Sequence, residues 1–158
     1  MIEIQSYDSS SSTYRLHLKL IDKIELSTDT NSSNRESLFI KDICKRIEKS
    51  KTVLYVLKND DDIIGLVALS ATSINDQPSI QVDYIFVSEK YRGQKIAELD
   101  NCKPFRYLID LSISLAKDFK SSIGLRYLVL SPDNDDLKEK YKQVDFKILD
   151  NDWMYFKL

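Results

Sequence analysis

Alternating apolar and polar positions predict strands at the start and in the middle of the chain. Residues 1–7 alternate in this way, and three apolar runs follow, "TVLYVLK" (52–58), "DIIGLVALSA" (62–71) and "SIQVDYIFV" (79–87). The first two runs are joined by "NDDD" and the last two are separated by "NDQP", and both compositions are typical of turns. We therefore expect the three central strands to form an antiparallel meander.

Apolar residues at helical spacing predict four helices. They cover residues 13–26, 35–49, 104–119 and 132–144, with a polar loop, "STDTNSSN" (27–34), between the first two. Pro104 and Pro132 suit the opening of a helix, because the N–H group that proline lacks would be unpaired there.

The pattern changes in the second half of the chain. "LRYLVLS" (125–131) is a continuous apolar run, which is typical of a strand buried on both faces. The strand 79–87, the helix 104–119 and this strand make a βαβ unit, so the two strands are parallel and the crossover is right-handed. The terminal "DFKILDNDWMYFKL" predicts a hairpin that turns at "DND". We expect one α+β domain, residues 1–158, with helices flanking a mixed, mostly antiparallel sheet of seven strands.

Composition and charge restrict the class of protein. The 158 residues are 42% hydrophobic and 30% charged, as in soluble globular proteins. The net charge of −2 and the pI near 5.5 argue against an overall nucleic-acid-binding surface. No apolar run approaches the roughly 20 residues of a membrane span, and the N-terminus lacks the features of a secretory signal. The two cysteines, Cys44 and Cys102, fit a reducing compartment, so we expect a cytoplasmic protein.

Few residues offer metal or thiol chemistry. His17 is the one histidine, so the usual zinc clusters are excluded. Asp60, Asp61 and Asp62 are the obvious carboxylates for magnesium, but their neighbours favour a solvated turn, and we expect no metal. Cys102 has no evident histidine partner and is interpreted as an ordinary thiol rather than an acyl carrier.

The stretch "VSEKYRGQKIAELD" (87–100) places a short basic turn between a strand and a predicted helix. Such turns bind phosphates, because the first N–H groups of the helix point into the turn. Gly93 is the one glycine of this stretch, and Lys95 stands where a second glycine is common. The alternative is an ordinary charged turn, but the surrounding elements favour a substituted phosphate loop.

Four stretches in order carry a family resemblance. They are "IIGLVAL", "DYIFVSEKYRGQKIA", "SPDNDDLKEKYKQVDF" and the closing "WMYFKL". With the element order given above, they resemble the GNAT superfamily of acyl-CoA-dependent N-acyltransferases. The second stretch is similar to the family's Arg-x-x-Gly-x-Gly/Ala loop, although Lys95 replaces its central glycine. Asp145 replaces the glycine of a Gly-Phe pair, and "ELDNCK" lengthens the connection to the next helix.

The resemblance implies acetyl-CoA as co-substrate and a set of site residues. The strands ending near Val87 and Ser131 would splay apart to admit the pantetheine arm. Backbone groups for the donor would come from Ile85, Phe86 and Val87, and the pyrophosphate would be bound by Arg92, Gly93, Gln94, Lys95, Ile96 and Ala97. Tyr141 would be the general acid for the departing thiolate, and Asn134 would contact the pantetheine. Asp83 would accept the proton of the amine, unless water does so.

Each of these roles has a structural alternative. Tyr141 would pack a short helix on the sheet, Asn134 would cap that helix, and Asp83 would orient the acceptor or pair with a nearby cation.

Three functions remain open at this level. The first is an N-acetyltransferase that moves an acetyl group from acetyl-CoA to a primary amine of a small molecule or peptide, directly and within a ternary complex. The second is a GNAT-like interaction module that binds CoA poorly, which Lys95 and Asp145 favour. The third is a toxin-like acyltransferase acting on aminoacyl-tRNA, for which we expect a basic surface beside the cleft. The basic residues of 41–51 are interleaved with Asp42 and Glu48, which favours a solvated helix face. The closing hairpin offers an edge through which a homodimer would pair.

Overall fold

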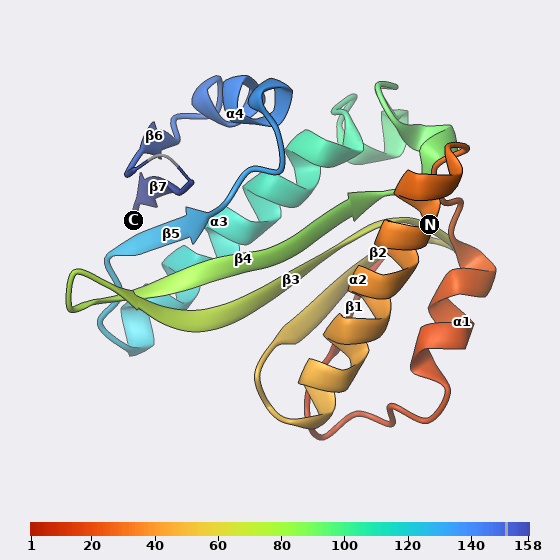
Figure 1. Ribbon diagram of the computed structural model, residues 1–158, viewed down its shortest axis with the longest axis horizontal. Helices are drawn as coiled ribbons and strands as arrows, with labels where there is room; N and C mark the ends of the chain where they lie inside the picture. The colour runs from red at the N-terminus through yellow and green to blue at the C-terminus, as the bar shows by residue number, and fades with distance from the viewer. Residues whose placement is uncertain (151) are drawn as a thin grey trace.

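The computed structural model describes residues 1–150 and 152–158 and shows one seven-stranded sheet with helices on both faces (Figure 1). The strand order is β1-β2-β3-β4-β5-β7-β6. The elements are β1 (Ile2–Tyr7), α1 (Leu16–Lys23), α2 (Thr30–Glu48), β2 (Val53–Asn59), β3 (Asp62–Ile74), β4 (Gln77–Val87), η1 (Glu89–Tyr91), η2 (Ala97–Leu99), α3 (Pro104–Ser122), β5 (Tyr127–Leu130), α4 (Asp135–Lys142), β6 (Lys147–Ile148) and β7 (Met154–Lys157).

The pairing of the strands confirms the predicted sheet. β4 and β5 are parallel, and every other neighbouring pair is antiparallel. The crossover between β4 and β5 contains α3, as the βαβ pattern predicts. β6 and β7 form the closing hairpin, whose predicted turn includes residue 151, which lies outside the described residues.

The predicted loop 27–34 is wrong in its second half, because α2 begins at Thr30. The carboxylate of Asp29 accepts a hydrogen bond of 2.9 Å from the N–H of Ser32, so Asp29 is the N-cap. The run of serines and asparagines that suggested a loop therefore forms the first turn and a half of the helix. α1 is shorter than predicted, since it runs only from Leu16 to Lys23.

Two further boundaries differ from the prediction for local reasons. α4 begins at Asp135 rather than at Pro132, because the side chain of Asn134 caps it. β3 and β4 extend toward each other until only Asn75 and Asp76 separate them, with φ angles of 49° and 62°. Two consecutive positive φ angles are typical of the tight hairpin turn whose twist matches its strands.

The hydrophobic core lies in two layers, one on each face of the sheet. Ile43 and Ile47 of α2 are buried on one face, and Leu108 and Ile109 of α3 are buried on the other. In Figure 1, α2 (orange) and α3 (teal) accordingly lie on opposite sides of β3 and β4. Among the described residues, no helix combines the length and the apolar character that a membrane crossing requires.

Gly65 in β3 allows close contact between β3, β4 and α3. A Cβ atom at this position would lie 2.6 Å from the carbonyl oxygen of Phe86 and 2.9 Å from Cδ1 of Leu108. We expect Gly65→Ala to lower the free energy of unfolding by about 1–3 kcal/mol, the usual cost of overpacking. Urea unfolding measures this, with Gly124→Ala as the matched control, because a Cβ at Gly124 meets nothing within 4 Å. Equal losses in the two variants would contradict the close approach.

Candidate active site

A cleft opens where β4 and β5 separate. Their parallel pairing stops at Gln81 and Val129, although β4 continues to Val87. The cleft has a volume of about 500 Å³, and it is lined by residues 82–87 of β4, by Leu130 at the end of β5 and by residues 131–134 after it. α2, α3 and α4 also contribute lining residues. The structure thus contains the splayed strands that the resemblance implies.

A β-bulge at Asp83 decides which side chains face which layer. In the register of β3 and β4, Leu69 is opposite Val82 and Ala68 is opposite Tyr84, so Asp83 is the extra residue. The alternation therefore shifts at this point. The prediction that Asp83 shares a strand face with Ile85 and Val87 is wrong. Ile85 and Val87 pack with the α3 layer, whereas the side chain of Asp83 points to the α2 side, where it pairs with Arg46.

The carboxylate of Asp83 is enclosed by donors. It accepts hydrogen bonds from the side chains of Thr52 (2.8 Å), Ser70 (2.9 Å) and Gln81 (3.0 Å). It also forms an ion pair of 3.4 Å with Arg46 of α2, and its side chain is 0% exposed. Asp83 belongs to the lining of the cleft, but its carboxylate is covered by these partners, which is the arrangement expected for the structural alternative.

The backbone of two residues near the end of β4, Ile85 and Val87, faces the opening. The N–H of Ser88 donates to the carbonyl of Ile64 in β3, at 2.8 Å. Because backbone groups alternate along a strand, those of Phe86 also face β3, and those of Ile85 and Val87 face the cleft edge. The backbone of Ile85 and the N–H of Val87 therefore face the cleft, the carbonyl of Val87 is bonded to Arg92, and the backbone of Phe86 faces β3 instead.

The loop after β4 keeps some of its amides free. The N–H groups of Arg92, Gln94 and Ile96 donate to carbonyls of the same region, at 3.2, 3.4 and 3.0 Å. Within the described residues, no acceptor is recorded for the intervening amides, those of Gly93, Lys95 and Ala97. Gly93 has a φ of 73°, which explains the glycine at this position.

The loop does not lead directly into a helix. α3 begins only at Pro104, and the intervening residues are held by a bridge between Ile96 and Cys102. Arg92 and Gly93 are the loop residues that line the cleft, while Lys95 is exposed outside it. The stretch "ELDNCK" (98–103) therefore separates the loop from the N-terminus of α3.

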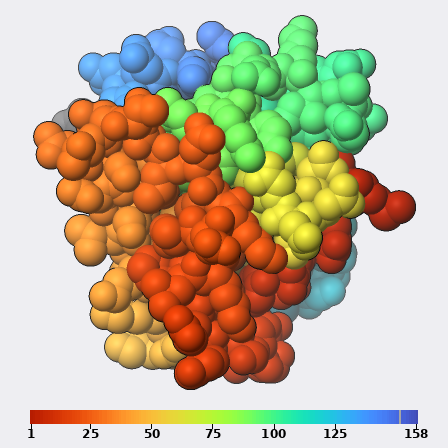
Figure 2. Space-filling view, turned by 90° about the vertical axis from the view of Figure 1, so that its right-hand side faces the viewer, coloured from red at the N-terminus to blue at the C-terminus, as the bar shows by residue number. Residues whose placement is uncertain are grey.

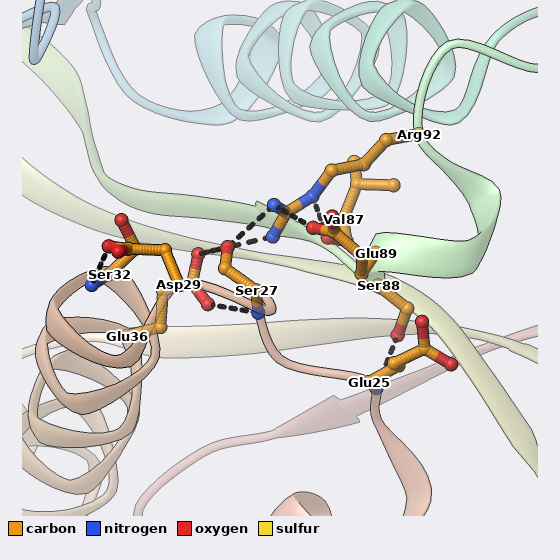
Figure 3. Close-up of polar contacts among 9 residues, drawn as sticks. All are labelled: Glu25, Ser27, Asp29, Ser32, Glu36, Val87, Ser88, Glu89 and Arg92. Atoms are coloured by element: carbon orange, nitrogen blue, oxygen red, sulfur yellow. Dashed lines mark hydrogen bonds and ion pairs between the residues drawn. The ribbon is translucent and has the colours of Figure 1, made fainter.

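The guanidinium group of Arg92 is bound by the protein itself (Figure 3). Its Nε donates to the carbonyl of Val87 at 2.8 Å, and its Nη atoms donate to Ser27, Glu89 and Glu36 at 2.7, 2.6 and 3.1 Å. Its charge also lies 5.4 Å from the centre of the Phe86 ring. The sequence predicts that Arg92 binds the pyrophosphate of the donor. In the structure its guanidinium is instead engaged by groups of the protein.

Tyr141 of α4 lies in the wall of the cleft with its ring well packed. The ring contacts those of Phe105 and Phe146, with centroids 5.4 and 5.5 Å away. Burial, together with the negative charge of Asp133, raises the pKa of the Tyr141 phenol above its usual value. The phenol is therefore protonated at neutral pH, as a proton donor must be.

Asn134 serves as the N-cap of α4. Its Oδ1 accepts a hydrogen bond of 2.9 Å from the N–H of Leu137, which is the alternative role considered for it. Asn134 also lines the cleft, so its amide nitrogen remains available there for a second contact.

The α2 side of the cleft was missed by the sequence reasoning. Phe39 stacks on Tyr84 with ring centroids 5.2 Å apart, and both residues line the cleft with Glu36. Burial is the main cause that raises the pKa of Tyr84, followed by the charge of Glu36. In the sequence, Phe39 has the spacing of a core residue of the predicted helix. Its aromatic side chain was the only feature that could have indicated a place in the cleft.

Within residues 1–150 and 152–158, no group of acidic, cysteine or histidine side chains is arranged to hold a metal ion. Both cysteines are free thiols. Burial raises the pKa of Cys44 to about 11, so that thiol is unreactive.

This combination of a mixed sheet, splayed parallel strands and a tyrosine at the opening defines an acyltransferase type of fold and cleft. The profile of the acetyltransferase (GNAT) family matches residues 18–99, more than half of the 158-residue chain. The chain therefore belongs to the GNAT acetyltransferase family. A search of the curated proteins finds no sequence that matches it.

Solved structures share the whole fold. The chain is similar to a tyrosine-to-phenylalanine mutant of the toxin AtaT bound to the C-terminus of the antitoxin AtaR, with a TM-score of 0.75 and 12% identity over 99% of this chain and 92% of that one. It is similar to AtaT complexed with acetyl-methionyl-tRNAfMet (TM-score 0.71, 11% identity, 99% and 95% covered). The KacTA–DNA complex gives a TM-score of 0.72 at 14% identity, with 99% and 93% covered. At these identities the likeness shows the fold alone.

Proposed function

We propose that this protein transfers an acetyl group from acetyl-CoA to a primary amine, directly and within a ternary complex. The observation that carries the proposal is the cleft between β4 and β5, which has unpaired strand edges on one side and the Tyr141 phenol in its wall. Family membership supports the reaction class.

The donor would be held mainly by backbone groups. The N–H and carbonyl of Ile85 and the N–H of Val87 would pair with the pantetheine arm, whereas the carbonyl of Val87 already accepts a hydrogen bond from Arg92. The N–H groups of Gly93, Lys95 and Ala97 have no recorded acceptor among the described residues, and they alternate along the loop. Backbone N–H groups left free in this way can each donate to a phosphate oxygen. Lys95 therefore does not block the loop, because its backbone rather than its side chain would make the contact.

The transfer needs a neutral amine and a proton for the leaving thiolate. The amine nitrogen attacks the thioester carbonyl, the C–S bond breaks, and the Tyr141 phenol gives its proton to the sulfur. The excess proton on the amine passes to water, since the Asp83 carboxylate is buried among its own donors. Most of the acceleration would come from holding the two substrates together, which contributes on the order of 7–11 kcal/mol in well-placed systems.

Acetyl-CoA should raise the melting temperature. At about 100 times its dissociation constant, a ligand stabilises the folded state by roughly 2.7 kcal/mol, which corresponds to roughly 5–10 °C for a chain of this size. A thermal scan with millimolar acetyl-CoA measures the shift, and acetyl-pantetheine, which lacks the phosphates of CoA, reports how much the loop contributes. No shift in a protein that melts cooperatively would favour the interaction-module alternative.

A second candidate acceptor is the α-amine of an aminoacyl-tRNA. It is favoured by the likeness to AtaT in complex with acetyl-methionyl-tRNAfMet. Lys41 and Lys45 of α2 and Lys49 directly after it are exposed and add positive charge to this region, although Arg46 pairs with Asp83. The net charge argued only against an overall nucleic-acid-binding surface, so binding of tRNA at a local patch is tested directly.

An acceptor assay separates the two candidates. Thiol release from acetyl-CoA is followed with charged methionyl-tRNA, with the same tRNA uncharged, and with spermidine as a small primary amine. Release with charged tRNA alone supports the toxin-like activity. Release with spermidine alone supports the small-molecule acceptor.

A further inference from the structure

The segment between α1 and α2 (residues 24–29, the α1–α2 segment) lies against the segment that follows β4 (residues 88–92, the post-β4 segment). Figure 2 shows the orange N-terminal part of the chain and the green part after β4 side by side on one face. The N–H of Glu89 donates to the carbonyl of Glu25 at 2.8 Å, and the N–H of Glu25 donates to Oγ of Ser88 at 3.3 Å. That hydroxyl donates to the carbonyl of Ile63 at 2.7 Å, so the contact is anchored on β3.

A second, ionic contact joins the same two segments through α2. Glu36 of α2 accepts hydrogen bonds from the N–H and the hydroxyl of Ser27, at 2.8 and 2.6 Å. Arg92 then donates to both Glu36 and Ser27, at 3.1 and 2.7 Å (Figure 3). The side chain of Glu36 is 16% exposed and that of Arg92 36%, so the carboxylate side of this contact is the more shielded from water.

Arg92 has little capacity left for a phosphate. A guanidinium group carries five N–H donors. In this structure four hydrogen bonds engage them, to Val87, Ser27, Glu89 and Glu36. Its positive charge is also neutralised by two carboxylates. The guanidinium therefore joins the two segments and caps the last carbonyl of β4.

We infer that Glu36 and Ser27 are positioning residues, which act through Arg92 to hold the end of β4 against the α1–α2 segment. Ser27, Glu36, Val87 and Arg92 all line the cleft, so the network joins its α2 wall to the strand that would hold the donor. Ordering of the donor loop is then transmitted to the α2 wall, where the amine would bind. This inference rests on the proposed function for the identity of the donor.

Hydrogen exchange of backbone amides tests the network on the intact protein, with acetyl-CoA as the ligand. In the wild type, acetyl-CoA should slow exchange in the loop 93–97 and also in residues 27–33, each by at least about threefold. In Glu36→Ala, the ligand should still protect 93–97 but leave 27–33 unprotected. Glu36→Gln keeps one acceptor oxygen, which can still serve the N–H of Ser27, and should restore part of the protection. Without ligand, Glu36→Ala should speed exchange at 27–33 by at least about fivefold, while the amides of β3 stay unchanged.

Asp42→Ala is the matched control, because it removes an exposed carboxylate from the same helix and should change neither segment. Equal protection of 27–33 in Glu36→Ala and the wild type would overturn the inference. If acetyl-CoA protects no amide in the wild type, the proposal that it is the donor fails. The comparison of ligand-free Glu36→Ala with the ligand-free wild type still tests whether the network exists. Unchanged exchange at 27–33 in ligand-free Glu36→Ala would then overturn it.

Discussion

Tyr141→Phe should lower kcat at least tenfold while leaving the acetyl-CoA dissociation constant within about twofold of the wild type. The substitution removes one oxygen atom and leaves the ring between Phe105 and Phe146. The fold and the donor site should therefore persist, whereas the thiolate loses its proton donor. General acids contribute about 10²–10⁴-fold, and each tenfold loss corresponds to about 1.4 kcal/mol of barrier. Thiol release under saturating substrates measures kcat, and calorimetry measures donor affinity.

Tyr14→Phe is the control for the loss of a phenolic oxygen. Tyr14 is 74% exposed and does not line the cleft, so its substitution should leave both quantities unchanged. Unchanged kcat in Tyr141→Phe would remove Tyr141 from the acid role and leave it as a packing residue. A parallel loss of donor affinity would mean that the phenol binds the donor.

Asp83→Ala should lower the free energy of unfolding by about 1–3 kcal/mol, the usual cost of leaving buried donors without their acceptor. The change leaves the donors of Ser70 and Gln81 without this acceptor and Arg46 without its carboxylate, while the hydroxyl of Thr52 keeps the carbonyl of Leu69. Urea unfolding at a fixed pH measures the loss. Asp42→Ala removes an exposed carboxylate and should change the stability by less than about 0.5 kcal/mol.

Asp83→Asn separates stability from chemistry. Asparagine keeps an acceptor oxygen in place, so a folded population should remain for assay. If Asp83 is structural, the kcat of that folded population should stay within about threefold of the wild type. A loss of two orders of magnitude or more, at full folding, would reinstate Asp83 as the general base.

Local patterns in the sequence predicted the order and the types of the helices and strands. The period of the apolar positions placed the meander, the crossover helix 104–119 and the buried strand 125–131 where the structure has β2 to β5 and α3. The parallel pair follows from that order, because parallel strands need a long crossover. Errors occurred where a side chain decided the boundary. Asp29 and Asn134 each cap a helix, and composition alone does not tell which of several polar residues does so.

The site was only partly predictable, because its side chains meet across long sequence separations. Tyr141 and Asn134 were found through motif spacing along one helix. The bulge at Asp83 was not foreseen, since it depends on the register against β3 and shifts the faces of every later residue in β4. Arg92 was interpreted as a phosphate ligand from its local motif. Its partners Ser27 and Glu36 lie 65 and 56 positions away in the sequence, so the motif could not reveal them.

The sequence by itself determined the element order, the mixed sheet and the family, since these depend on periodicity and on short motifs that act within one element. Only the tertiary structure decided which carboxylate is buried, which backbone edges remain free and how Arg92 is engaged. These properties depend on which groups are brought within hydrogen-bond distance, and hence on strand register and helix docking. Such distances are fixed by the packing of the whole chain rather than by any local pattern.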